Sequence, residues 1–389
     1  MPSARPRDLN KRLILRTIAR HQPISRADVA KRTGLTRPTI SNIVADWLDA
    51  GLVQELGAQV SQGGKPGILL GIVADARWVL AVTAADNLLV AGLVNLQGEV
   101  RHLQTWALQD DQDALPQLLA LLDSLMPMAP GPVLGLGAAI TGVVDSHQGV
   151  VHRAVYLDWE DVPLARILAR RYELPVHVVN DSAAAALGAY AFDANIQAEN
   201  LAVIRIGQGI GAGLILNGKL HLGESFGAGE IGHWVVVENG EPCRCGRFGC
   251  LETVASAAAI LRQARAIYHA RPESAFHHHF ANAAAISLAG LAHLAQAGNP
   301  DARGIIANAG RHLGNILAAL VGILDVGHIQ LSGEVEALGE PLLAPVRQAI
   351  HQKTLPMLAR NLTLSFSTLG ESITLLGAAV PIIQQELGI

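Results

Sequence analysis

Cysteine and aromatic residues are scarce in this sequence, and long apolar runs are missing. Three of the 389 residues are cysteine, and aromatic residues make up 4%. No run of about 18 apolar residues lacks a charged or polar interruption, so we predict no membrane-spanning helix. Arg5, Arg7, Lys11 and Arg12 are not followed by an apolar region, which argues against a secretory signal. We therefore expect a cytoplasmic protein without a membrane partner.

Positive charge is concentrated near the N-terminus, although the whole chain is slightly acidic at −4. Residues 1–70 contain eleven Lys or Arg against five Asp or Glu, and residues 71–389 contain 18 against 28. A small basic module joined to a large acidic body is typical of a nucleic-acid reader fused to another domain. Half of the residues are hydrophobic, which supports a large core. We predict one domain over residues 1–70 and a second over residues 71–389.

The basic module has the pattern of a helix-turn-helix. Residues 9–20 place apolar side chains at helical spacing. Ser25 is the predicted N-cap of a helix over Arg26–Thr33, and Gly34 supplies the turn that follows it. Thr36 is the predicted N-cap of a third helix with an exposed polar and basic start. A helix of that kind enters the major groove of DNA in helix-turn-helix proteins.

Two strand-like runs follow, on either side of a tip at residues 63–67, and they predict a β-wing that reaches phosphate or the minor groove. The predicted DNA contacts are Thr36, Arg37, Thr39, Ser41, Asn42 and Lys65. A helical bundle used for protein contact is the alternative interpretation. Because helix-turn-helix proteins usually read two half-sites of an operator, we expect a homodimer or homotetramer.

From about residue 77 the pattern changes to strands alternating with helices. A hairpin followed by a helix occurs near residues 79–126 and again near residues 201–268. We therefore predict an α/β body built from a pseudo-repeat, with a cleft between two lobes. In such folds binding sites lie at the carboxyl ends of the strands.

All three cysteines lie within one short Gly- and Arg-containing turn. Cys243, Cys245 and Cys250 span eight positions, and His233 lies ten residues upstream of the first. Three thiolates and one imidazole complete the tetrahedron that Zn²⁺ prefers, which leaves no position for a substrate. We predict a structural zinc site; the alternative is three incidental buried cysteines.

Polar residues of the type that bind sugar hydroxyls flank this turn. Asn180 and Asp181 lie where a predicted strand meets a predicted helix, Glu230 and His233 precede the cysteines, and Glu252 follows them. Carboxylates and amides that bind vicinal hydroxyls are typical of a carbohydrate site, and a neighbouring metal would hold them in place. Each residue taken alone is equally typical of a surface charge or a helix cap. For Asp181 in particular, an N-cap and a ligand contact are equally plausible.

The runs GEIGH (residues 229–233) and CRCGRFGCLE (residues 243–252) resemble the signature of the ROK family, which includes sugar kinases and sugar-responsive repressors. The resemblance extends over nearly the whole chain, and the N-terminal module resembles that of the repressors. It implies a winged helix-turn-helix joined to an actin-like, ribonuclease-H-type two-lobed α/β fold. It also implies zinc on His233, Cys243, Cys245 and Cys250, and a sugar held by Asn180, Asp181, Glu230, His233 and Glu252.

The phosphate-binding motifs depart from those of the family's kinases. Residues 83–87 read TAADN in place of a D-x-G-G-T loop, Gln208 replaces a usual Thr, and Glu334 brings a carboxylate toward the nucleotide side. Phosphoryl transfer depends on positioning and charge neutralisation, so we predict no catalytic residues. The sequence thus predicts a DNA-binding repressor whose operator affinity a sugar or sugar phosphate modulates. An ATP-dependent hexose kinase with a fused DNA module is the alternative, and a platform for a partner protein is a third possibility.

Overall fold

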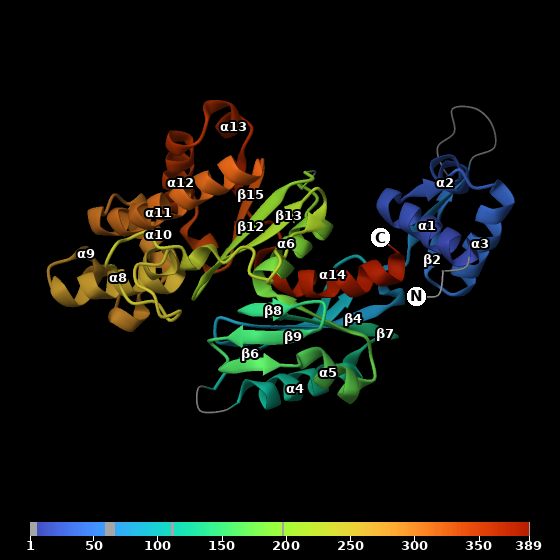
Figure 1. Ribbon diagram of the computed structural model, residues 1–389, viewed down its shortest axis with the longest axis horizontal. Coiled ribbons are helices and arrows are strands. Elements are labelled where there is room, and N and C mark those ends of the chain that lie inside the picture. Colours follow the sequence, from blue (N-terminus) through green and yellow to red (C-terminus); the bar gives the residue numbers. More distant parts are fainter. Residues whose placement is uncertain (1–5, 59–66, 110–112, 197, 389) are drawn as a thin grey trace.

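The computed structural model describes residues 6–58, 67–109, 113–196 and 198–388. A small N-terminal head lies beside a larger body, and each of the two lobes of the body contains a five-stranded sheet (Figure 1). These features confirm the predicted α/β architecture.

In the described part of the head, helices pack on a small antiparallel sheet with the order β1-β3-β2. The elements are α1 (Pro6–His21), β1 (Ile24–Ser25), α2 (Arg26–Thr33), α3 (Arg37–Asp49), β2 (Val53–Ala58) and β3 (Ile68–Ile72). Ile14, Ile18, Val29, Ile40 and Val44 are buried in its core. This is the predicted winged helix-turn-helix.

The predicted helix caps of the head are confirmed. The Ser25 side chain accepts a hydrogen bond from the Asp28 N–H, and the Thr36 side chain accepts one from the Thr39 N–H. Gly34 ends α2 with φ at 70°, a left-handed conformation that favours glycine. The wing tip, with Lys65, lies outside the described residues. Because β3 continues to Ile72, the predicted domain boundary after residue 70 falls inside this strand.

The first lobe contains a mixed sheet with the order β11-β7-β4-β5-β6. Its strands are β4 (Trp78–Ala85), β5 (Leu88–Asn95), β6 (Val100–Ala107), β7 (Val133–Ile140) and β11 (Val176–Asn180). Helices α4 (Ala114–Leu125) and α5 (Leu164–Tyr172) pack on it through a shared apolar cluster. A small antiparallel sheet of β8 (Val143–Asp145), β9 (Val150–Ala154) and β10 (Trp159–Val162) belongs to the same lobe.

The second lobe repeats the sheet topology of the first. Its order is β14-β13-β12-β15-β16, with β12 antiparallel to β13 and parallel to β15, as β4 is to β5 and β7. Its strands are β12 (Leu201–Ile206), β13 (Ile210–Leu216), β14 (Lys219–Leu220), β15 (His328–Ser332) and β16 (Thr363–Phe366). The predicted pseudo-repeat is therefore confirmed.

Helices of the second lobe lie to one side of its sheet (Figure 1). They are α7 (Glu252–Ala255), α8 (Ala257–Ala270), α9 (Ala275–His279), α10 (Leu288–Gln296), α11 (Pro300–Leu324), α12 (Glu340–Lys353) and α13 (Pro356–Arg360).

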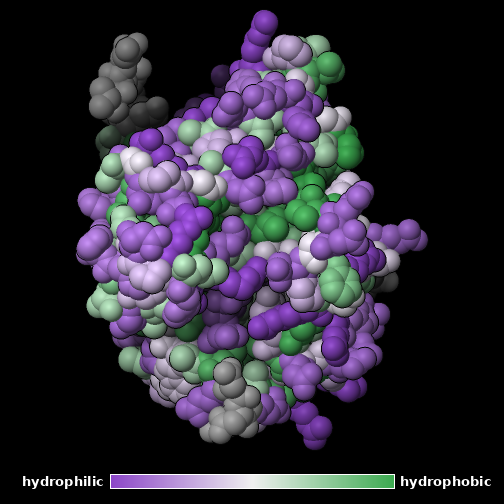
Figure 2. Space-filling model, turned by 90° about the vertical axis from the view of Figure 1, so that its left-hand side faces the viewer, coloured by the Kyte–Doolittle hydropathy of each residue, from purple (hydrophilic) through white to green (hydrophobic). Residues whose placement is uncertain are grey.

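Short 3₁₀ turns occur in both lobes, at η1 (Ala74–Ala76), η2 (Met126–Met128), η3 (Ile231–His233), η4 (Ala283–Ala285), η5 (Glu334–Leu338) and η6 (Gly370–Ser372). The face that carries α8 and α9 is mostly hydrophilic, with hydrophobic residues in small separate patches (Figure 2).

Two buried helices, α6 (Asp181–Phe192) and α14 (Ile373–Leu387), pack on each other at the centre of the molecule. Their contact is close because glycines face the partner backbone: a Cβ on Gly377 would lie 1.6 Å from the Ala184 carbonyl oxygen. The C-terminal part of α14 also contacts α1, and Ile383 and Leu387 share one apolar cluster with Ile14. The head thus rests on the last helix of the body. Among the described residues, no helix has the length and apolar character needed to cross a membrane.

Candidate metal site and effector cleft

The three cysteines lie in a compact turn that starts after η3. Isolated bridges pair Val235 with Cys250 and Pro242 with Phe248, so the turn folds back on itself. Gly249 has φ at 69°, and a Cβ there would lie 1.7 Å from the Val237 carbonyl oxygen. Only glycine fits at this position, because the conformation is left-handed and the backbone approaches closely.

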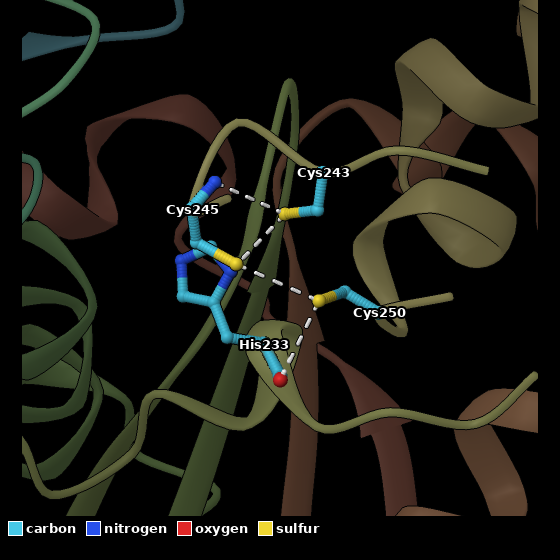
Figure 3. A group of neighbouring side chains, drawn as sticks. All are labelled: His233, Cys243, Cys245 and Cys250. Atoms are coloured by element: carbon cyan, nitrogen blue, oxygen red, sulfur yellow. Dashed lines mark hydrogen bonds between the residues drawn. The ribbon is translucent and has the colours of Figure 1, made fainter. Parts of the chain in front are cut away.

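The turn brings four metal-ligand atoms together (Figure 3). One ligand atom from each of His233, Cys243, Cys245 and Cys250 lies within 4.8 Å of all the others. The Cys245 and Cys250 sulfurs are 3.7 Å apart, and the Cys243 sulfur is 3.5 Å from His233 Nδ1. Zinc–sulfur bonds of about 2.3 Å in a tetrahedron place two sulfurs about 3.8 Å apart. The four residues therefore fit zinc.

Hydrogen bonds inside the turn hold these side chains in place. The Cys245 N–H donates to the Cys243 sulfur, and the Cys250 thiol faces the His233 carbonyl oxygen. The Cys243 thiol donates to Glu252 Oε1 at 2.9 Å. Burial, and then this bond, raise the pKa of Cys243. Cys243 is therefore hydrogen-bonded directly to Glu252, one of the predicted sugar contacts.

The His233 ring connects the cysteine cluster with two carboxylates. Its Nδ1 is 3.7 Å from Glu252 Oε1, and its Nε2 is 3.8 Å from Glu230 Oε2. Nδ1 therefore faces the thiols, and Nε2 faces the neighbouring carboxylate. Burial raises the pKa of the Glu230 carboxyl, and the nearby His233 ring opposes this shift.

A cavity of about 450 Å³ opens beside this group, between the two lobes. All five predicted sugar contacts line it: Asn180, Asp181, Glu230, His233 and Glu252. A cavity of this size is typical of a small-molecule site, and its mostly polar and charged lining suits a polar ligand. The structure thus brings together residues from β11, α6, η3 and α7.

Other cavity residues were not among the predicted contacts. Tyr156 and Arg244 both line it, and the guanidinium lies over the tyrosine ring, 4.6 Å from the ring centre. Burial, and then the charge of Glu252, raise the pKa of Tyr156 to about 12, so its hydroxyl stays protonated and can donate. Arg153 lines the same cavity and pairs with Glu160 at 3.2 Å.

Asn180 has a structural role that the sequence left open. Its Oδ1 caps α6 by accepting from the N–H groups of Ser182 and Ala183, and its Nδ2 donates to the Gly142 carbonyl at 2.8 Å. The N-cap is thus Asn180, and Asp181 is the first residue inside the helix. Asn180 thus lines the cavity while its side-chain amide is hydrogen-bonded to the backbone.

Asp181 is bound by an arginine, Arg205, that was not predicted from the sequence. Arg205 on β12 donates to Asp181 Oδ2 at 3.0 Å and also to Asp86 Oδ2. Asp86 lies in the turn between β4 and β5, so the guanidinium joins residues of both lobes. A cation within the apolar run LAVIRI was the only sequence signal for this contact.

The Asp86 carboxylate lies on the loop that would hold phosphate in a kinase. Asp86 Oδ1 accepts from the Gln208 N–H at 2.8 Å, and a Cβ on Gly207 would lie 2.5 Å from this carboxylate. Glu334 is close enough to interact electrostatically with both Asp86 and Arg205, and burial raises its pKa. The Asp86 carboxylate therefore lies against the loop at Gly207 and Gln208, and Glu334 adds a second carboxyl near it.

On the head, the described predicted DNA contacts lie at the start of α3. Thr36, Arg37, Ser41 and Asn42 are exposed, and Thr39 is half-buried. The hydroxyls of Thr36 and Thr39 lie 2.9 Å apart, so part of their hydrogen bonding is used within the cap. Arg37, Ser41 and Asn42 remain the most accessible of the set.

Comparison with known proteins agrees with this architecture. Residues 80–385 match the ROK family, and residues 8–59 match the MarR family. The xylose repressor of Caldicellulosiruptor bescii is 28% identical over 387 residues, which cover 98% of this chain and 97% of that protein. A glucokinase of Halalkalibacterium halodurans is 30% identical over 319 residues, which cover 80% of this chain and 96% of the kinase.

Among solved structures, a ROK family transcriptional regulator described as a homologue of the Escherichia coli Mlc protein superposes with a TM-score of 0.82 and 28% identity. The match covers 98% of this chain and 96% of the other, so it includes both the head and the two lobes. The family match spans most of the described body, and the matches to the xylose repressor and to the solved regulator cover both the head and the body. This chain belongs to the ROK family, with a winged helix-turn-helix joined to an actin-like two-lobed domain.

Proposed function

We propose that the protein is a DNA-binding transcriptional repressor whose operator affinity is modulated by a sugar or sugar phosphate bound in the cleft. The observation that carries this proposal is the packing of a DNA-reading head against the same body that contains the cavity. The similarity to a xylose repressor supports a carbohydrate effector. The five polar residues that line the cavity are our proposed sugar contacts.

We further propose that His233, Cys243, Cys245 and Cys250 hold a structural zinc ion. The donor set is complete for a tetrahedron, and no ligand position is left for a substrate. When bound, zinc would fix the turn next to the cavity. The chain's own residues, Glu230 and Glu252, would then bind the sugar hydroxyls.

The carboxylates that surround Arg205 are our reason for proposing that the protein is not a kinase. ATP phosphates would meet the carboxylates of Asp86, Asp181 and Glu334 around a single guanidinium. Repulsion between these carboxylates and the phosphates would disfavour the binding and charge neutralisation that phosphoryl transfer requires. The similarity to a glucokinase keeps a hexose kinase as the second candidate, and an ATP-consumption assay with a panel of hexoses tests it.

A repressor of this type has to match two half-sites, so a homodimer or homotetramer remains our expectation. Reduced cysteines and a DNA partner favour a cytoplasmic location. Sedimentation of the purified protein with and without operator DNA would measure the oligomeric state.

The central test of the proposed function is ligand-dependent DNA binding. Duplexes selected from a random library with the full chain would provide the operator, and a panel of sugars and sugar phosphates would be added in a gel-shift titration. At least one compound should change operator affinity, with a coupling of about 1–3 kcal/mol. Equal affinity with every compound contradicts an effector-controlled repressor.

Replacing Arg37 with alanine should reduce discrimination between operator bases. Its exposed side chain at the start of α3 is placed to donate to base edges, and such a contact is worth about 1–3 kcal/mol. Competition binding with single-base operator variants measures this loss. Arg347→Ala, in an exposed ion pair on α12, is the matched control and should leave DNA binding unchanged.

Replacing Glu230 with glutamine should weaken effector binding by about 10–100-fold, because a hydrogen bond to a charged group contributes about 1.5–3 kcal/mol. Calorimetric titration with the compound found in the gel-shift panel measures it. Glu340→Gln changes the same group at an exposed position on α12, away from the cavity, and should have no effect. Equal affinities for the two variants would remove Glu230 from the site.

A further inference from the structure

Three charged side chains join three separate parts of the body. Asp86 comes from the β4–β5 turn of the first lobe, Arg205 from β12 of the second, and Asp181 from the start of α6. Their exposed fractions are 14%, 18% and 8%, so the group is largely shielded from solvent. An ion pair with this burial is screened much less than a surface pair.

Each carboxylate in this group is also bound by the backbone. Asp86 Oδ1 accepts from the Gln208 N–H, and Asp181 Oδ1 accepts from the Ser182 N–H at 2.9 Å. The planar guanidinium binds one carboxylate with Nη1 and the other with Nη2, a geometry that lysine cannot reproduce. Relative motion of the lobes would therefore break charge-assisted bonds.

This group lies at the cavity, and one of its members begins a buried helix. Asp86, Asp181 and Arg205 all line the cavity. Asp181 is the first residue of α6, which packs on α14 through Gly188 and Gly377. At these two glycines the helix backbones approach each other directly, so a shift of α6 would displace α14. The end of α14 packs on α1 of the head.

We propose that the Asp86–Arg205–Asp181 bridge holds the lobes in the operator-binding arrangement and that the α6–α14 pair transmits changes in the bridge to the head. This inference rests on the proposed function. A sugar hydroxyl that donates to Asp181 competes with Arg205 for the same carboxylate. Effector binding then loosens the bridge, α6 shifts, and the head moves out of register with the operator.

The first test measures the head directly and requires neither operator nor effector. In Arg205→Met, hydrogen–deuterium exchange of the amides in the last turn of α14 and in α1 should rise by about tenfold relative to the wild type. Arg153→Met is the matched control, because Arg153 also lines the cavity but pairs with Glu160 inside the small sheet of one lobe. Unchanged exchange in Arg205→Met overturns the proposal.

The second test measures operator binding by the full chain. Without effector, Arg205→Met should bind the selected duplex about tenfold more weakly than the wild type and should respond less to the effector. Asp86→Asn keeps the shape of the bridge and removes one charge, so it serves if Arg205→Met does not fold. Wild-type operator affinity in a folded Asp86→Asn variant, together with wild-type exchange in α14, refutes the bridge.

Different results would contradict the effector-controlled repressor and the Asp86–Arg205–Asp181 bridge. If no carbohydrate changes operator binding of the wild type, the effector model falls, while the exchange measurement still decides whether the bridge controls the head. If a sugar acts equally on the wild type and on a folded Arg205→Met, the repressor model stands and the bridge is refuted.

Discussion

Replacing Gly377 with alanine is expected to destabilise the body by about 3 kcal/mol or more. The new Cβ would lie 1.6 Å from the Ala184 carbonyl oxygen and 2.4 Å from its carbon. Both atoms are backbone, so no side chain can rotate away, and α6 and α14 would have to separate along their whole contact. Overpacking costs about 1–3 kcal/mol where side chains can adjust, and a rigid contact costs more. Urea unfolding followed by circular dichroism measures the change.

Gly322 provides the matched control for this substitution. It lies inside α11 and is exposed, and a Cβ added there would meet nothing within 4 Å. Alanine there should stabilise the protein by up to about 1 kcal/mol, because alanine has the higher helix propensity. Equal effects of Gly377→Ala and Gly322→Ala would show that α6 and α14 are not in close backbone contact.

Replacing Cys250 with serine should lower zinc affinity by at least about 100-fold and loosen the turn between Trp234 and Cys250. Cys250 is fully buried, and its sulfur is one of four converging donors. Substitution of residues that merely support a metal ligand already costs about 10–100-fold in affinity, so the loss of a ligand costs more. Metal analysis of purified protein and limited proteolysis of the turn measure both effects, and effector binding should fall in parallel.

Arg247→Ala is the control in the same turn. Arg247 is exposed and contributes no ligand atom, so its loss should leave zinc content unchanged. A wild-type chain that is purified without metal, resists proteolysis in the turn and binds its effector would contradict the zinc assignment.

Local signals in the sequence were sufficient for much of the secondary structure. Ser25 and Thr36 cap the helices that their patterns predict, because a capping side chain acts within three residues of its own position. The cysteine cluster was readable for a similar reason: its ligands are close in sequence and chemically distinctive.

Contacts between distant segments were not readable from local patterns. Arg205 meets Asp86 across 119 positions, and in the sequence it is only a cation within an apolar strand. The sequence also left open whether Asp181 is an N-cap or a ligand contact, and the structure gives the cap of α6 to Asn180. The small β8–β9–β10 sheet was missed because its strands are only three to five residues long.

The position of α14 has a consequence for how this protein is made in the cell. Strand β4 is synthesised early, yet one of its faces packs on a helix that begins about 300 residues later. At roughly 5–20 residues per second, translation leaves that apolar face uncovered for about 15–60 s. The nascent first lobe therefore exposes apolar surface, and with it a risk of aggregation, until the last helix has been made.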